Sequence, residues 1–176
     1  AEMQSLRSDE KPKPGAISPL QCVENTLKIF RASLPAEISL LCNLEDNLPR
    51  IQSGALQLHQ LLMNICSNAR DALNGQGALE VSLAKRNQVS PMQCAFCHGE
   101  FSGEFISLCV KDDGAGIEPE CMHRIFDPFF TTKNNGARLG LGLSIAAELA
   151  HEVQGHVQVE STLGKGSCFS IWIPLH

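Results

Sequence analysis

The sequence has 176 residues, which predicts one domain with enough chain to bury a full hydrophobic core. Its 14 Lys and Arg residues against 19 Asp and Glu residues leave a formal net charge of −5. This balance argues against a protein that holds nucleic acid or an anionic membrane by its overall charge. The longest nearly apolar stretch, residues 139–150, is too short to span a bilayer, because a crossing helix needs about 20 residues.

Residues 1–15 are expected to be a linker or a disordered segment, since they combine charges with two prolines, and the domain is expected over residues 16–176. Apolar residues at helical spacing predict helices over residues 18–31, 55–73 and 141–153, with a short helix over 119–126. Alternating apolar residues predict strands over residues 37–44, 78–84, 105–110, 156–160 and 167–173. An insert rich in Gly, Ser, Pro and Cys lies at about residues 87–103. This mixture, with the last two strands as a hairpin, predicts an α+β sandwich rather than an alternating parallel sheet.

The helix over residues 55–73 carries a row of polar side chains beside its apolar face. Asn64, Asn68 and Asp71 fall within a wedge of about 60° around the helix axis. Asn is unfavourable inside a helix, because its amide competes for backbone hydrogen bonds. The row is either a polar helix edge or a set of oxygen ligands for a Mg²⁺ ion that carries phosphates.

Two glycine-containing segments follow predicted elements. Residues 112–116 read Asp-Asp-Gly-Ala-Gly directly after a strand, where Asp113 offers a carboxylate to an exocyclic amine and the glycines let backbone approach a flat ring. An ordinary Asp-Gly turn has the same residues. Residues 136–144 carry three glycines before a helix, which exposes backbone N–H groups to an anion such as a phosphate.

Together and in this order, the motifs resemble the ATP-binding catalytic domain of sensor histidine kinases, in the GHKL ATPase superfamily. Residues 64–72 resemble its N box, 113–116 its G1 box, 126–133 its F box, 140–143 its G2 box and 164–174 its closing hairpin. The resemblance covers roughly residues 16–174. It implies a two-layer α/β sandwich of the GHKL type, with a mixed, mostly antiparallel sheet, about three covering helices and a mobile ATP lid near residues 127–139.

The resemblance implies a role for each motif residue. Asn68 is expected to hold Mg²⁺ with Asn64 beside it, and Asp113 to receive the adenine amine. Lys133 is expected to meet the γ-phosphate from the lid, so that Asn64, Asn68 and Lys133 form the catalytic set. The other expected ATP-binding residues are Asp71, Gly114, Gly116, Ile117, Phe126, Phe130, Thr132, Arg138, Leu139, Gly140, Leu141, Gly142 and Leu143.

Two departures from the family pattern bear on mechanism. Hydrolytic members of the superfamily carry a Glu four residues before the Mg²⁺-binding Asn, where this sequence has Asn64. An amide is not a base near neutral pH, so transfer to a protein nucleophile is favoured over reaction with water. The family's usual Gly-Thr-Gly-Leu-Gly-Leu is replaced by Arg138-Leu139 before Gly140, and Arg138 is expected to supply charge to the phosphates.

The family's phosphoacceptor helix with its His motif is absent from these residues. The expected partners are therefore a His-containing dimerisation and phosphotransfer domain of the same kinase and a downstream response regulator. The expected location is the cytoplasm, with a parent protein that a membrane segment anchors elsewhere. A stand-alone GHKL ATPase and a degenerate ATP-sensing interaction module are the alternatives. His59, His151 and His156 match no phosphoacceptor of the family and are expected at solvated surface positions.

The sequence contains eight cysteines, which are expected to be free thiols in a reducing cytoplasm. Cys94 and Cys97 form a Cys-x-x-Cys pair followed by His98. The pair predicts a Zn²⁺ site, or else two loop cysteines that are either free thiols or joined by a reversible disulfide. His98, Cys109 and Cys121 are the candidates for completing a zinc site. The insert that carries the pair is expected to lie outside the nucleotide pocket.

Overall fold

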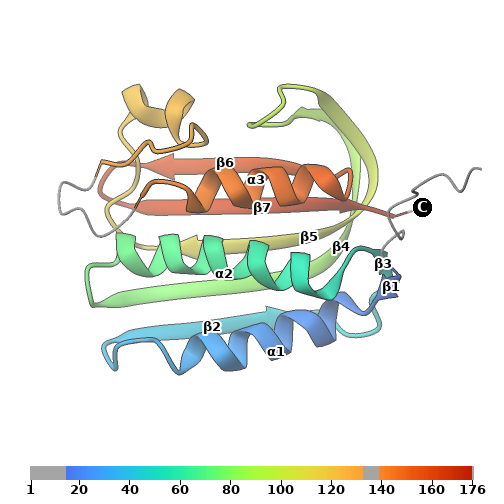
Figure 1. The fold of residues 1–176 in the computed structure, drawn as a ribbon, viewed down its shortest axis with the longest axis horizontal. Coiled ribbons are helices and arrows are strands. Elements are labelled where there is room, and N and C mark those ends of the chain that lie inside the picture. The colour runs from blue at the N-terminus through green and yellow to red at the C-terminus, as the bar shows by residue number, and fades with distance from the viewer. Residues whose placement is uncertain (1–14, 133–138, 176) are drawn as a thin grey trace, which may run out of the picture.

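The computed structural model describes residues 15–132 and 139–175, which form two layers (Figure 1). One layer is a five-stranded sheet, and α1, α2 and α3 lie side by side on one face of it. Most of the predicted linker over residues 1–15 lies outside the described residues. In chain order the elements are β1 (Ala16–Ile17), α1 (Pro19–Arg31), β2 (Ile38–Leu44), β3 (Ile51–Gln52), α2 (Ala55–Ala72), β4 (Gly77–Gln93), β5 (Glu100–Asp112), the 3₁₀ helix η1 (Pro119–Arg124), α3 (Gly142–Glu152), β6 (His156–Thr162) and β7 (Gly166–Pro174).

The five strands run in the order β2-β4-β5-β7-β6. β2 lies parallel to β4, and the other neighbouring pairs are antiparallel. This confirms the predicted α+β fold with a mixed, mostly antiparallel sheet and three covering helices. The short strands β1 and β3 pair with each other outside the main sheet, and they were not predicted because two residues carry no periodicity.

The helices begin where local chemistry favours them. The Ser18 hydroxyl accepts the Gln21 N–H at 3.3 Å, and Pro19 occupies the first turn of α1. In α2, the side chain of Gln57 accepts the Gly54 N–H at 2.9 Å. The buried face of α2 consists of Leu58, Leu61, Leu62, Ile65, Cys66 and Ala69. Burial of this face on the sheet fixes the direction in which the polar edge of α2 points.

The β4–β5 hairpin is longer than predicted. Both strands continue through the region expected to be an insert, with one irregularity between Gln88 and Met92. The extended part curls over one end of β6 and β7 (Figure 1). Few apolar residues alternate here, so the sequence pattern was weak, while backbone pairing alone extends the strands. Among the described residues, no helix is long and apolar enough to cross a membrane.

Candidate functional site

Backbone hydrogen bonds join the four sequence motifs in two pairs. The turn after β5 is tied to the end of α2, because the Ala115 N–H donates to the Ala72 carbonyl at 3.2 Å. The segment after η1 is tied to the start of α3 by a bond of 3.0 Å from the Phe129 N–H to the Gly140 carbonyl. Since α2 and α3 pack side by side (Figure 1), the fold gathers segments that are up to 80 residues apart in the sequence.

The polar edge of α2 is half-buried, and its two amide side chains lack hydrogen-bond partners among the described residues. The Asn64 Nδ2 atom is buried without a hydrogen-bond partner. The Asn68 side chain makes no hydrogen bond with the residues that the structure describes. Asp71 lies one turn on, with Oδ1 3.7 Å from the Arg70 Nε. A buried amide that lacks a partner costs free energy, so these side chains fit a polar ligand better than a plain helix edge.

The two adjacent aspartates after β5 have opposite environments. Asp113 is exposed, and its Oδ1 accepts the Ala78 N–H at 2.8 Å. Asp112 is 2% exposed; its Oδ1 accepts the Gly114 N–H at 3.0 Å, and its Oδ2 is buried without a partner. The geometry therefore favours Asp112, and not Asp113 as predicted, as the carboxylate that accepts a ligand's amine.

Burial raises the pKa of the Asp112 carboxyl, and the charge of Asp113 adds to this rise. The N–H groups of Gly114 and Ser167 oppose it without cancelling it. The sequence pattern of β5 also points to Asp112 as a buried residue. Leu108, Val110 and Asp112 alternate along β5 and are all buried, so the strand's period already placed this carboxylate inside.

The predicted glycines of this turn are held where a side chain would not fit. A Cβ on Gly114 would collide with the Ala72 carbonyl of α2. Gly116 has a φ of +72°, and a Cβ there would collide with the Thr162 carbonyl at the end of β6. The following N–H, of Ile117, donates to the Ser161 hydroxyl at 2.8 Å. The turn is thus clamped between α2 and the closing hairpin, and the carboxylate of Asp112 is held in place.

The segment after η1 contains the predicted aromatic residues. Phe126 is half-buried, and the Arg124 guanidinium lies over the Phe130 ring at 4.5 Å from its centroid. This contact of Arg124 was not predicted. Thr132 is exposed. Lys133 and Arg138, both predicted to bind phosphate, lie outside the described residues, as does the middle of the predicted lid.

The start of α3 is uncapped and open. Leu141 is the N-cap residue and gives no side-chain hydrogen bond, so the first N–H groups of α3 have no partner from a cap. A Cβ on Gly142 would meet no described atom within 4 Å, whereas one on Gly140, with a φ of +71°, would lie 2.6 Å from the Phe130 carbonyl. Leu139 is exposed, while Leu143 packs against the core. This arrangement fits an anion at the N-terminus of α3.

The cysteine pair has a third neighbour that the sequence did not predict. Ligand atoms of Cys94, Cys97 and His156 lie within 4.8 Å of one another. His98, Cys109 and Cys121 are not in this group, and the Cys109 sulfur lies 2.6 Å from that of Cys168 instead. The prediction of His156 as a solvated residue is wrong, because its Nδ1 is buried and burial lowers the pKa of its imidazole.

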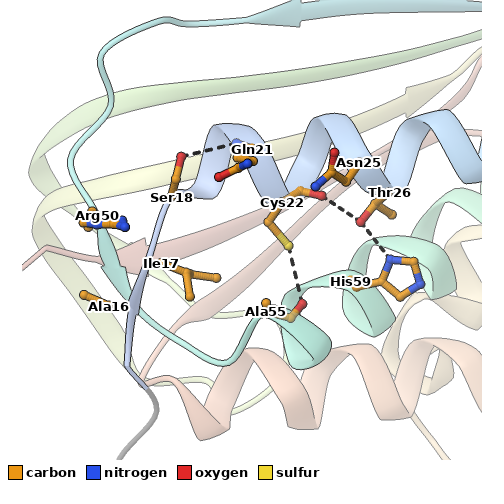
Figure 2. Close-up of a pocket in the computed structure, with 10 residues that line it drawn as sticks. All are labelled: Ala16, Ile17, Ser18, Gln21, Cys22, Asn25, Thr26, Arg50, Ala55 and His59. Atoms are coloured by element: carbon orange, nitrogen blue, oxygen red, sulfur yellow. Dashed lines mark hydrogen bonds between the residues drawn. The ribbon is translucent and has the colours of Figure 1, made fainter.

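A cavity of about 350 Å³ lies elsewhere, between β1, the start of α1 and the start of α2 (Figure 2). Its polar atoms bond to one another: Thr26 Oγ1 lies 2.9 Å from the His59 Nδ1 and donates to the Cys22 carbonyl at 2.8 Å. No residue of the four motifs lines it. This cavity is therefore separate from the site that α2, the turn after β5 and α3 form.

Known proteins resemble this chain over most of its length. Residues 54–176 match the family described as histidine kinase-, DNA gyrase B- and HSP90-like ATPase. Sensor histidine kinase ZraS of Escherichia coli (strain K12) is 34% identical over 140 residues, which are 80% of this chain and 26% of that protein. The histidine-protein kinase AtoS of the same strain is 31% identical over 155 residues, 88% of this chain and 23% of that protein. The chain thus spans about a quarter of the length of these curated relatives.

Solved structures show the same fold. The catalytic domain of histidine kinase ThkA, in a nucleotide-free form, matches with a TM-score of 0.72 at 22% identity, over 91% of this chain and 94% of that chain. Full-length ShkA in complex with AMPPNP matches with a TM-score of 0.72 at 21% identity, over 95% of this chain and 32% of that chain. With the family match covering most of the sequence, the chain belongs to the histidine kinase-, DNA gyrase B- and HSP90-like ATPase family and is homologous to the ATP-binding catalytic domains of sensor histidine kinases.

Proposed function

We propose that this chain binds Mg²⁺-ATP between α2, the turn after β5 and the start of α3, and transfers the γ-phosphoryl group to a histidine. The acceptor lies on a separate dimerisation and phosphotransfer domain of the same kinase, and a response regulator then receives the phosphoryl group. The reaction takes place in the cytoplasm, where ATP is supplied. The catalytic domains of the homologous sensor kinases support this assignment.

The observation that carries the proposal is the unpartnered Oδ2 of Asp112. A buried carboxylate oxygen without a donor is costly, and the exocyclic amine of adenine supplies a donor. The glycines at 114 and 116 keep the turn flat against α2 and the closing hairpin, so that a planar ring can approach the backbone. Asp112 therefore recognises adenine and excludes bases that present an acceptor at the same place.

The phosphates are held by α2 and α3. The unpaired amide groups of Asn64 and Asn68 fit this role, because an amide offers an oxygen to Mg²⁺ and N–H groups to phosphate. Asn68 holds the metal, and the uncapped N–H groups at the start of α3 donate hydrogen bonds to the phosphate oxygens. Mg²⁺ neutralises the charge that develops on the transferred group. In this proposal Lys133 meets the γ-phosphate and Arg138 supplies further positive charge to the phosphates. The lid over residues 127–139 becomes ordered when nucleotide binds.

The residue at position 64 decides between transfer and hydrolysis. Asn64 has no basic group that removes a proton from water, so the bound phosphoryl group waits for a better nucleophile. A histidine imidazole is such a nucleophile near neutral pH without a base from this domain. This favours a kinase over a stand-alone ATPase.

The test is phosphoryl transfer in trans. With radiolabelled ATP and Mg²⁺, the chain is expected to bind nucleotide, fail to label itself and label a supplied phosphoacceptor domain of the same kinase. Asn68→Ala is expected to abolish labelling, whereas Asn43→Ala, the same change at an exposed position of the edge strand β2, serves as the control. Binding of ATP without transfer to the acceptor domain, or labelling of a histidine in this chain, contradicts the proposal.

A further inference from the structure

The group of Cys94, Cys97 and His156 joins two parts of the chain that are 59 residues apart or more. Cys94 and Cys97 lie in the turn at the tip of the β4–β5 hairpin, and His156 is the first residue of β6. Cys94 is buried, His156 is half-buried and Cys97 is exposed. The group is therefore anchored on its inner side and open to solvent on its outer side.

Backbone hydrogen bonds hold the hairpin tip against β6. The Ala95 N–H donates to the Val157 carbonyl at 2.7 Å, and the Gln158 side chain donates to the Gln93 carbonyl at 2.9 Å. The Val157 N–H donates to the Cys94 sulfur at 3.3 Å. An N–H group that points at a buried sulfur stabilises its thiolate form, which is the form that binds metal.

The turn between the two cysteines is closed tightly. The His98 N–H donates to the Cys94 carbonyl at 3.0 Å, and the Cys94 N–H donates to the Gly99 carbonyl at 2.8 Å. His98 adopts a φ of +63°, a conformation that few side chains adopt without cost. This turn directs both sulfur atoms to one side, whereas the His98 ring is outside the group.

His156 is fixed in position but lacks a partner. Its ring stacks on Phe101 with centroids 4.4 Å apart and an angle of 4° between the planes. Its Nδ1 is buried and makes no hydrogen bond with the described residues. A buried ring nitrogen without a partner is unfavourable unless another group binds there. The imidazole of His156 is therefore held in one orientation with a ring nitrogen that no described residue binds.

We propose that Cys94, Cys97 and His156 bind one Zn²⁺ ion that fastens the hairpin tip to β6. Two thiolates and one neutral imidazole balance the charge of Zn²⁺, so the complex has zero net charge, and the fourth position faces solvent and takes a water. Tetrahedral bonds place such ligand atoms about 3.6–3.8 Å apart. The present separations, all within 4.8 Å, therefore close by at most about 1 Å. Sulfur ligands exclude Mg²⁺ and Ca²⁺, which prefer oxygen.

The zinc site lies next to the segment after η1. Phe96 lies between the two cysteines in the sequence. Its ring contacts the rings of Phe126 and of His151 in α3 edge-on, with centroids 5.9 Å and 6.0 Å apart. The hairpin tip, which was expected to lie outside the nucleotide pocket, thus packs against Phe126 of the motif over residues 126–133. A metal that locks the Cys94–Cys97 turn also locks the aromatic side chain that supports Phe126.

The test uses the whole chain, purified without chelator and kept reduced so that no disulfide forms. After incubation with ZnCl₂ and desalting, elemental analysis is expected to find about one zinc per chain, and zinc is expected to raise Tm. Cys97→Ser, at an exposed position, and His156→Gln are each expected to reduce zinc affinity at least about 100-fold, beyond the usual effect of losing a residue that only supports a ligand. Cobalt in place of zinc is expected to give the intense visible absorption of a tetrahedral thiolate site.

His98→Asn is the matched control, because it removes the neighbouring imidazole while Asn tolerates the positive φ. This variant is expected to keep wild-type zinc affinity. Less than about a tenth of an equivalent of zinc in the reduced wild type overturns the proposal. Loss of zinc in His98→Asn but not in His156→Gln, or stoichiometric copper without zinc, overturns it as well.

Discussion

Asp112 and Asp113 are adjacent in the sequence, yet only Asp112 keeps a buried carboxylate oxygen without a hydrogen-bond partner. Asp113 ties the start of β4 to the end of β5 through the Ala78 N–H. Asp113 therefore joins the two strands, whereas Asp112 keeps a carboxylate oxygen that a ligand can bind. The two variants Asp112→Asn and Asp113→Asn separate these roles.

Asp112→Asn is expected to weaken ATP binding at least about tenfold, because it replaces a charge-assisted hydrogen bond worth about 1.5–3 kcal/mol. Asp113→Asn is expected to leave ATP affinity within about twofold and to cost only the strand-edge contact. Isothermal titration calorimetry with Mg²⁺-ATP measures both. A larger loss of ATP affinity in Asp113→Asn than in Asp112→Asn would show that Asp113 makes the adenine contact.

Asp112→Asn is also expected to stabilise the protein without nucleotide. Burial raises the pKa of this carboxyl above its usual 3.8, so the folded chain binds the proton more tightly than the unfolded chain. Between the usual and the raised pKa, stability falls as pH rises, because the folded state must lose a proton that it prefers to keep. Asp112→Asn has no ionisable group at this position, so it does not lose stability in this way as pH rises.

The difference in Tm between Asp112→Asn and the wild type is therefore expected to grow as pH rises above 3.8 and to level off above the raised pKa of Asp112. At this chain length, each kcal/mol of stability shifts Tm by about 2–4 °C. Thermal unfolding at a series of pH values measures the difference. Parallel pH profiles for the two proteins would show that the carboxyl of Asp112 is not destabilised by folding.

Local patterns predicted the elements that bury one regular face. Apolar spacing located α2 within one residue at each end, and alternation located the buried part of β4, where Leu79, Val81 and Leu83 face the core. The same alternation extended by two residues along β5 would have distinguished Asp112 from Asp113. The Asp-Gly spacing indicated the exposed Asp113 and not the buried Asp112, because a turn pattern carries no information on which side chain points inward.

Contacts between distant segments were not predictable from local patterns. His156 meets Cys94 only because the hairpin curls over β6, and that curvature depends on pairing between strands, not on residues near His156. The packing of Phe96 on Phe126 has the same origin. The motif residues of α2 were identified because they share one helix edge, which spacing alone defines.

Asn64→Glu is expected to convert part of the transfer activity into ATP hydrolysis. A carboxylate at this position of α2 provides a base near the bound phosphates, and general base catalysis contributes about 10²–10⁴-fold. Steady release of inorganic phosphate is expected to rise at least about tenfold, while transfer to the phosphoacceptor domain falls. Asn64→Gln keeps an amide and controls for size. Equal phosphate release by both variants would contradict the role of position 64.

Gly140 and Gly142 are expected to respond in opposite ways to substitution by Ala. Gly140→Ala places a Cβ 2.6 Å from the Phe130 carbonyl at a φ of +71°, so it is expected to lower Tm and to disturb the base of the lid.

Gly142→Ala adds a methyl group that meets no described atom within 4 Å at the first residue of α3. Replacing Gly in a helix without strain stabilises a protein by about 0.4–1 kcal/mol, so Tm is expected to rise. ATP affinity is nevertheless expected to fall, because the added methyl group lies where phosphates approach the N–H groups of α3. Thermal unfolding without nucleotide and calorimetry with Mg²⁺-ATP separate the two effects, and a Gly142→Ala variant with unchanged ATP affinity would remove the start of α3 from the phosphate site.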